Sequence, residues 1–223
     1  MILRATQSAP IRVTVKRAAS AAGVVALLGA WAAAAAGRGM TMHMIAHMTS
    51  VAVAAPLIAF GLSGTALDPA QRWPRVVAPL AMSIVELVVV WGWHAPAARA
   101  LAAGSAAGLA AEQISFAAVG VGLWCACYGT RDAPSSMRRA AAILALLWTT
   151  MHMTLLGALI TLAPRPLFPA HAHGGLPWGL SALADQQLAG VVMLLVGGGA
   201  YLGGGLALLA GLLRERGAEV APR

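Results

Sequence analysis

Six apolar segments, separated by short polar ones, limit what this chain can fold into. A helix needs about 20 mainly apolar residues to cross the roughly 30 Å hydrocarbon core of a bilayer. Open strands cannot satisfy their backbone hydrogen bonds in lipid, and the alternating pattern of a membrane barrel is absent from the sequence. We therefore predict an all-α integral membrane protein, a bundle of six transmembrane helices. The segments cover residues 18–36, 41–62, 76–93, 101–128, 140–162 and 187–213.

The amino-acid composition supports this class of protein. Hydrophobic residues make up 60% of the chain and charged residues only 10%, whereas a soluble domain carries about 25% charged residues. The formal charge of +8 raises nucleic-acid binding as an alternative. However, the basic residues lie in the short segments between apolar runs, where membrane topology places them. We therefore expect membrane lipid, and no nucleic acid, around this chain.

The distribution of Lys and Arg predicts the orientation. If six helices cross the membrane, twelve basic residues lie on the side of the two termini and three lie on the other side. Cytoplasmic loops carry the excess of positive charge, so both termini are predicted to be cytoplasmic. We divide the chain into a basic N-terminal segment (1–17), a transmembrane domain (18–213) and a cytoplasmic tail (214–223). The three basic residues on the outer side are Arg38, Arg99 and Arg165.

The first apolar segment has a second interpretation. A basic start, an apolar run and then Ala34, Ala35 and Ala36 also form the pattern of a cleaved signal peptide. Cleavage would leave five helices and would keep every later loop on the same side of the membrane. The arguments about the site below hold in both cases.

Residues 40–48 concentrate methionine and histidine. This stretch holds four methionines and two of the six histidines in the chain. His43 and His47 stand four residues apart, so on a helix they share one face, about 6 Å apart along the axis. Thioether and imidazole are ligands that suit copper, especially Cu(I). Methionine is also an ordinary apolar filler of helices, so packing explains this stretch equally well on its own.

Other helices are expected to bring further ligand-capable residues to the same depth. Ionisable groups inside a membrane are costly and usually mark a functional site. Each residue alone also has a structural explanation, such as an interfacial anchor or a bond to a neighbouring carbonyl, and their convergence favours a shared site. Glu86 is predicted nearer the middle of its helix. His152 is also predicted near the middle of the membrane, and Met193 about two turns further in than residues 185–187. The residues predicted in the outer half or at its mouth are His43, His47, His94, Glu112, Gln113, Asp185 and Gln186.

Other candidate groups are weaker. His171 and His173 lie in the long outer loop and could catch a metal or form a solvated turn. Cys125 and Cys127, near the cytoplasmic end of the fourth segment, could bind Cu(I) but have no third ligand in view. Phosphate-binding loops, nucleophile elbows and zinc-protease motifs are absent from the sequence. We therefore predict ligation of a metal and no enzymatic activity.

Five motifs in order resemble one family. Residues 42–48 followed by Ala-Ala-Pro-Leu at 54–57 are similar to the opening motif of the polytopic CtaG-type cytochrome c oxidase assembly factors. The other matches are Trp-His-Ala-Pro at 93–96, Leu-Leu-Gly-Ala-Leu-Ile-Thr at 155–161, Ala-Pro-Arg-Pro-Leu-Phe-Pro at 163–169 and Asp-Gln-Gln-Leu-Ala-Gly at 185–190, closed by Met193. The resemblance covers residues 40–213.

The resemblance implies a membrane protein that helps to mature haem–copper oxidases by delivering copper to the catalytic subunit. It implies His43, His47, His94, His152, Asp185 and Met193 as site positions. Gln113 stands where the family usually has a histidine, and Leu194 stands where a tryptophan often follows the methionine. These departures leave the ligand set open. We expect copper, as Cu(I), to be held by ligands from His43, His47, Met44, His94, His152 and Met193, with Asp185, Glu112 and Gln186 orienting the imidazoles.

The expected location is the bacterial inner membrane, with the metal site towards the periplasm. The expected partners are the oxidase catalytic subunit and a periplasmic copper donor. Three alternatives remain open at this point. A haem-binding electron carrier would use His47 and His152 as axial ligands, a copper permease would move the metal across the membrane, and a structural scaffold would bind no metal.

Overall fold

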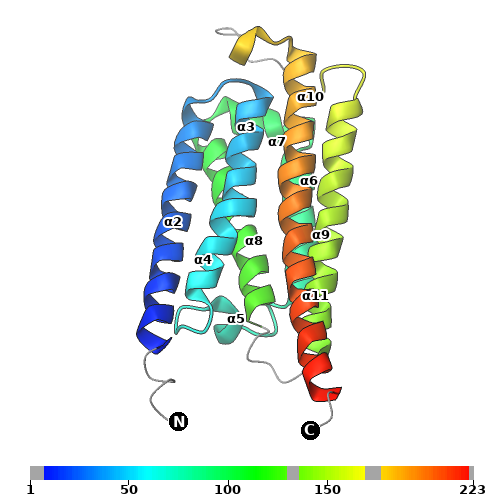
Figure 1. The fold of residues 1–223 in the computed structure, drawn as a ribbon. Coiled ribbons are helices and arrows are strands. Elements are labelled where there is room, and N and C mark those ends of the chain that lie inside the picture. The colour runs from blue at the N-terminus through cyan, green and yellow to red at the C-terminus, as the bar shows by residue number, and fades with distance from the viewer. Residues whose placement is uncertain (1–7, 130–135, 169–176, 221–223) are drawn as a thin grey trace.

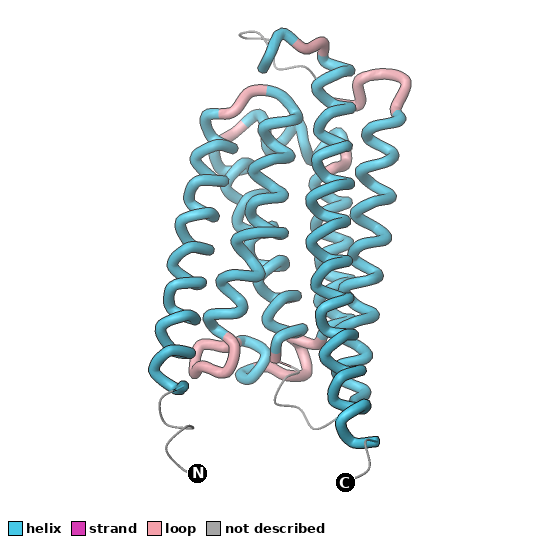
Figure 2. The backbone as a smooth tube through the Cα atoms, viewed as in Figure 1, coloured by secondary structure: helices cyan, strands magenta, loops and turns pink. Residues whose placement is uncertain are grey.

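The computed structural model describes residues 8–129, 136–168 and 177–220. This part of the chain is a bundle of long, nearly parallel and antiparallel helices and contains no strand (Figures 1 and 2). Five of its helices are long and apolar enough to cross a membrane, and the number is six if the bent pair α6–α7 counts as one span. The predicted all-α membrane fold is therefore confirmed. The main helices are α2 (Ser8–Ala36), α3 (Gly39–Met48), α4 (Ala55–Leu62), α6 (Pro79–Trp93), α7 (Pro96–Gly104), α8 (Ala106–Tyr128), α9 (Ser136–Leu162), α10 (Ala182–Val192) and α11 (Gly198–Val220).

The start of α2 and the end of α11 lie at one end of the bundle, and α3 and α10 begin at the opposite end (Figure 1). An ion pair between Arg139 of α9 and Glu215 of α11 lies at the first of these ends. This arrangement requires an even number of crossings, in agreement with six. Helix α2 begins at Ser8, so it takes in part of the basic segment that precedes the first apolar run. Helix α11 likewise continues beyond residue 213.

The third and fourth apolar segments differ from the expected boundaries. Helices α6 and α7 meet at an angle of 73°. The break falls before Pro96, whose ring disfavours a helical conformation in the preceding residue, and Ala95 is accordingly extended. Residues 101–104 complete α7, whereas α8 begins at Ala106, where the hydroxyl of Ser105 accepts a hydrogen bond from Gly108 N at 2.9 Å. The predicted start of the fourth segment, residue 101, was therefore too early.

Two π-helical segments interrupt the long helices in the interior. The segment η1 (Thr49–Ala54) joins α3 to α4, and η3 (Met193–Gly197) joins α10 to α11; the two segments are in contact. Such insertions widen the helical turn and are frequent at functional sites. The carbonyl of Val51 in η1 accepts hydrogen bonds from Trp124 Nε1 at 3.2 Å and from the Tyr201 hydroxyl at 3.5 Å. In the core, the backbone carbonyl of Val51 therefore accepts hydrogen bonds from side chains of other helices.

Candidate metal centre

Three histidines gather around Phe116 in the half of the bundle that lies away from the termini. His43 and His47 come from α3, His94 directly follows α6, and Phe116 belongs to α8. The ring centroids lie 6.4 Å apart for His43 and His47, 6.1 Å for His43 and His94, and 5.3 Å for His47 and His94. Phe116 stacks on His47 at 3.8 Å. The four rings are buried, so packing of α3, α6 and α8 brings together three of the predicted ligands.

The spacing of His47 and His94 suits a shared metal ion. With a metal–nitrogen bond of about 2 Å, two imidazoles on one ion have centroids roughly 5 Å apart at a tetrahedral angle and roughly 6 Å apart in a linear arrangement. His47 and His94 fall near the first value, so these two rings are spaced to share one ion. Both pairs that contain His43 fall near the second value, and His43 cannot be opposite both other rings at one ion, so it would have to move closer to become a third ligand. Among the described residues, no three His, Cys, Asp or Glu side chains already converge on one point. Binding of one ion by three of these side chains would therefore require them to move from the positions seen here.

The ring nitrogens of His47 and His94 are the chemically informative atoms. His94 Nδ1 lies 2.7 Å from the carbonyl oxygen of Val90, so Nδ1 carries the hydrogen and Nε2 keeps its lone pair. His94 Nε2 and both nitrogens of His47 are buried without a hydrogen-bond partner in the structure. A buried polar atom left in this way costs about 1–3 kcal/mol. A bound cation would satisfy lone pairs on both rings.

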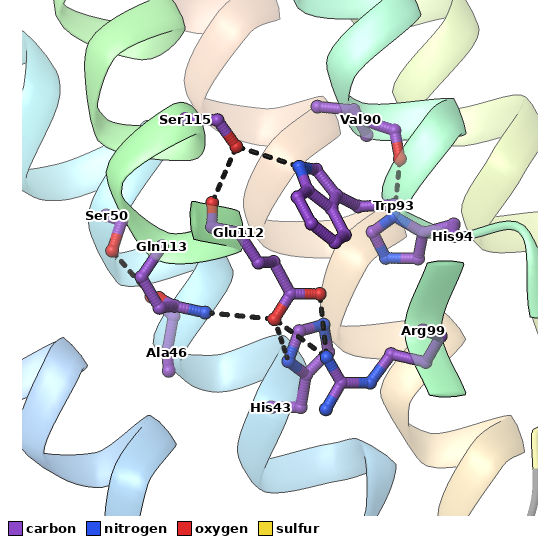
Figure 3. A network of polar contacts seen from close by, with 10 residues as sticks. All are labelled: His43, Ala46, Ser50, Val90, Trp93, His94, Arg99, Glu112, Gln113 and Ser115. Carbon is purple, nitrogen blue, oxygen red and sulfur yellow. Dashed lines mark hydrogen bonds and ion pairs between the residues drawn. The ribbon is translucent and has the colours of Figure 1, made fainter. Parts of the chain in front are cut away.

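Glu112 of α8 is held next to His43 (Figure 3). Arg99 of α7 donates from Nη1 to both carboxylate oxygens at 2.7 Å, and Gln113 Nε2 lies 3.5 Å from Oε2. His43 Nδ1 lies 3.7 Å from the same oxygen. Glu112 therefore lies beside the imidazole of His43, at a distance longer than a hydrogen bond. Because Arg99 balances the charge of Glu112, the carboxylate can remain ionised although it is completely buried.

A second set of hydrogen bonds fastens α8 to the end of α6. Trp93 Nε1 donates to the hydroxyl of Ser115 at 2.8 Å, and this hydroxyl donates to the carbonyl of Glu112 at 2.8 Å (Figure 3). Trp93 immediately precedes His94. The hydrogen bonds therefore tie the backbone that carries Glu112 to the backbone that carries His94.

Sequence analysis missed two residues of this cluster. The sequence prediction treated Arg99 only as a basic residue on the outer side of the membrane. In the structure Arg99 lies on α7, the helix that begins at Pro96, and this helix packs against α8. Phe116 lies four residues after Glu112 and three after Gln113, so it shares their helix face. That spacing was a usable signal for Phe116. The partnership of Arg99 with Glu112 has no such local signal, because it depends on the bend between α6 and α7.

The remaining predicted ligands, His152, Met44 and Met193, are also buried. His152 of α9 has 3% exposure and two ring nitrogens without hydrogen-bond partners. Its ring makes no contact with the rings of the other described histidines. Met44 and Met193 are completely buried in the same apolar core as Phe116. Both thioethers are therefore shielded from solvent.

Asp185 has different partners from those expected. Its carboxylate accepts hydrogen bonds from Met40 N at 2.5 Å and Thr41 N at 3.2 Å, and its backbone carbonyl accepts one from the Thr41 hydroxyl at 2.8 Å. Gly39 has φ +82°, and a Cβ there would lie 2.6 Å from Asp185 Oδ2. The carboxylate thus binds the N-terminus of α3, where free N–H groups and the helix dipole favour a negative charge. Asp185 positions the helix of His43 and His47 rather than an imidazole.

Gln186 also has a structural role. Its side-chain oxygen accepts a hydrogen bond from Leu167 N at 2.6 Å, and its amide donates to the carbonyl of Ile160 at 3.3 Å. Both partners belong to the end of α9 and the loop that follows it. The predicted contact of Gln186 with an imidazole is therefore not observed; the side chain instead joins α10 to α9.

The weaker candidates do not extend the site. Cys125 and Cys127 are buried on α8 and form no disulfide bond with each other; they stand two residues apart, so they point to different sides of the helix. Cys127 Sγ lies 3.9 Å from the carbonyl of Ala142 in α9. His171 and His173 lie outside the described residues.

Comparison with known proteins identifies a family. The family model described as "Cytochrome c oxidase caa3 assembly factor (Caa3_CtaG)" matches residues 1–215. No curated protein and no solved structure matches the chain.

Proposed function

Since this chain belongs to the cytochrome c oxidase caa3 assembly factor family, we propose that it assists oxidase assembly by binding Cu(I) at the histidine cluster. Family membership makes it an oxidase assembly factor and implies an association with the oxidase. Copper is then the cargo, and the catalytic subunit of the oxidase is the acceptor. The protein would hold and release the metal ion and would catalyse no change of covalent bonds.

The single observation that carries this proposal is the pair His47 and His94. Their rings are 5.3 Å apart, both are buried, and three of their four nitrogens have no hydrogen-bond partner in the structure. Neutral imidazole is the form that binds metals. A pair of neutral imidazoles in an apolar site, beside a core rich in methionine, has the chemistry that favours Cu(I) over hard cations.

The neighbouring residues support the same proposal. His43 is the candidate third ligand, and Glu112 lies at its Nδ1, so that an Nδ1–H donated to the carboxylate would leave Nε2 for the metal. Arg99 cancels the charge of Glu112, so the site around the three imidazoles carries little net charge. The negative charge of Glu112 would then offset the repulsion between the Arg99 guanidinium and a bound monovalent cation.

The location of the cluster indicates how copper could arrive and leave. His43 and His47 belong to α3, which begins at the end of the bundle opposite the start of α2 and the end of α11 (Figure 1). His94 lies beside them. If those helix ends face the cytoplasm, as the basic residues predict, the cluster faces the periplasm. We therefore propose a periplasmic copper donor and delivery to the periplasmic side of the oxidase subunit.

The test is metal analysis of the full-length protein purified in detergent and supplied with Cu(I) under reducing conditions. The double variant His47→Ala/His94→Ala should lose most of the copper that the unchanged protein retains. The matched control is His152→Ala, which removes a buried histidine outside the cluster and should retain copper. Equal copper in the double variant and the unchanged protein would rule out this site. A Soret band in the same sample would instead support the haem alternative.

A further inference from the structure

A second group of buried polar side chains surrounds Glu86, apart from the histidine cluster. Glu86 lies eight residues before His94, which is about 12 Å along a helix axis. Its side chain is completely buried between α6, α8, α9 and α11. A carboxyl group at this depth requires an explanation, because ionisable groups inside a membrane are costly to bury and usually functional.

Tyr201 of α11 holds the carboxyl group in place. Its hydroxyl makes a hydrogen bond with Glu86 Oε1, and its ring stacks on Trp124 of α8 with centroids 5.5 Å apart. The same hydroxyl lies 3.5 Å from the carbonyl oxygen of Val51, to which Trp124 Nε1 also donates. Tyr201 therefore links the carboxyl group of Glu86 to Trp124 of α8 and to Val51 of η1.

The hydrogens in this arrangement can be counted. The Tyr201 hydroxyl has one hydrogen but two neighbouring oxygens, Glu86 Oε1 and the carbonyl of Val51. A carboxylate and a carbonyl can only accept, so one of the two contacts would lack a hydrogen if Glu86 were ionised. If Glu86 carries a proton, its O–H donates to the Tyr201 oxygen and the Tyr201 O–H donates to Val51. A neutral carboxyl group satisfies both contacts.

Further oxygens near Glu86 are also without partners. Glu86 Oε2, the hydroxyl of Ser83 one turn earlier on α6, and the hydroxyl of Thr149 on α9 are all buried without a hydrogen-bond partner in the structure. Thr149 faces Glu86 across the interface of the two helices. The Ser83 and Thr149 side chains are uncharged hydroxyls, and each can either donate a hydrogen bond or accept one.

The charges around Glu86 point in the same direction. Among the described residues, the ion pairs involve Glu112 and Glu215, and none joins a cation to Glu86. The titratable groups that face Glu86 are Cys127 from α8 and Tyr201 from α11, and neither supplies a positive charge. From α9 it faces the uncharged hydroxyl of Thr149. An ionised carboxyl would be buried without compensation, which is far more costly than burying a neutral acid.

We propose that Glu86 and Tyr201 form a proton-binding site in the interior of the bundle, in which Glu86 carries a proton at neutral pH. The ligand of this site is the proton itself, held between Glu86 and the Tyr201 oxygen. The site is independent of copper, because it shares no side chain with the histidine cluster.

Infrared spectroscopy of the full-length protein, reconstituted in lipid at neutral pH, tests this directly. The unchanged protein should show a carbonyl stretching band of a protonated carboxylic acid that shifts in D₂O. Glu86→Gln should remove this band, since an amide replaces the acid with little change of shape. The control Glu215→Gln removes an exposed, ion-paired carboxylate and should leave the band in place.

A second variant keeps the proposal testable if Glu86→Gln does not fold. Tyr201→Phe should retain the band but move it to higher frequency, because the acid loses its hydrogen-bond acceptor. A spectrum of the unchanged protein without an acid band at neutral pH would overturn the proposal. So would a band that survives in folded Glu86→Gln, or one whose frequency is unaffected by Tyr201→Phe.

Discussion

Arg99 and Glu112 form a buried ion pair beside the histidine cluster, with Arg99 Nη1 2.7 Å from each carboxylate oxygen. The two residues lie on separate helices, α7 and α8, and both are almost completely shielded from solvent. The pair places a negative charge at the edge of the cluster and neutralises it at the same time. It also fastens α7, which bends away from α6 directly after His94, against α8.

Removing one member of this pair should be strongly destabilising. In Glu112→Gln the Arg99 guanidinium stays buried without its counter-ion, and loss of one partner from a buried pair costs about 3–5 kcal/mol. The thermal unfolding temperature in detergent should fall well below that of the unchanged protein. The double variant Arg99→Met/Glu112→Gln should recover much of this loss. A single variant as stable as the unchanged protein would contradict a buried pair.

The same carboxylate should influence copper independently of stability. Loss of a residue that orients a metal-binding imidazole typically weakens metal affinity by about 10–100-fold. Copper titration of folded Arg99→Met/Glu112→Gln should therefore show weaker binding than the unchanged protein. Unaltered affinity in this double variant would mean that Glu112 does not orient His43.

Asp185 should act on the helix rather than on the metal. Asp185→Ala removes the acceptor for two backbone N–H groups at the start of α3, and loss of such a cap costs about 0.5–2 kcal/mol. The unfolding temperature should fall by the same amount in copper-free and copper-loaded protein. If the fall occurred only in the loaded protein, Asp185 would instead act on the metal site.

Phe116 should hold the ring of His47 in its observed orientation. Phe116→Leu keeps the site apolar but removes an aromatic stack, which is worth about 0.5–1.5 kcal/mol beyond the buried area. We expect a modest loss of stability and a change in the signals of the His47 ring in nuclear magnetic resonance spectra of selectively labelled protein. His152 signals serve as the internal control and should be unchanged. Identical His47 signals in both proteins would contradict the stacking.

Chemical labelling of single cysteines tests the predicted orientation. Ala103→Cys lies on exposed α7 near the histidine cluster, and Ala66→Cys lies in the loop at the opposite end of the bundle, each in a background without Cys125 and Cys127. If the excess of basic residues faces the cytoplasm, an impermeant thiol reagent should label only Ala103→Cys in cells with a permeabilised outer membrane and an intact inner membrane. Ala66→Cys should react after lysis. The reverse pattern would invert the topology.

The all-helical fold class and the approximate positions of the membrane-spanning helices were predictable from the sequence. Hydropathy determines which segments are transferred into lipid, and lipid leaves the backbone few options besides a helix. The shared face of His43 and His47 was also predictable, because it depends only on a spacing of four residues within one helix. These features are local, so residues close in sequence are sufficient to determine them.

The partners of the site residues were decided by the tertiary structure. The carboxylate of Asp185 in α10 accepts a hydrogen bond from the N-terminus of α3 because α10 packs beside α3. Arg99 contacts Glu112 because the chain bends before Pro96. His94 joins His47, whereas His152, an equally good ligand by sequence, does not contact it. Periodicity shows that a helix has a polar face but does not specify which other helix that face will meet. That choice depends on how the side chains of several helices fill the core together.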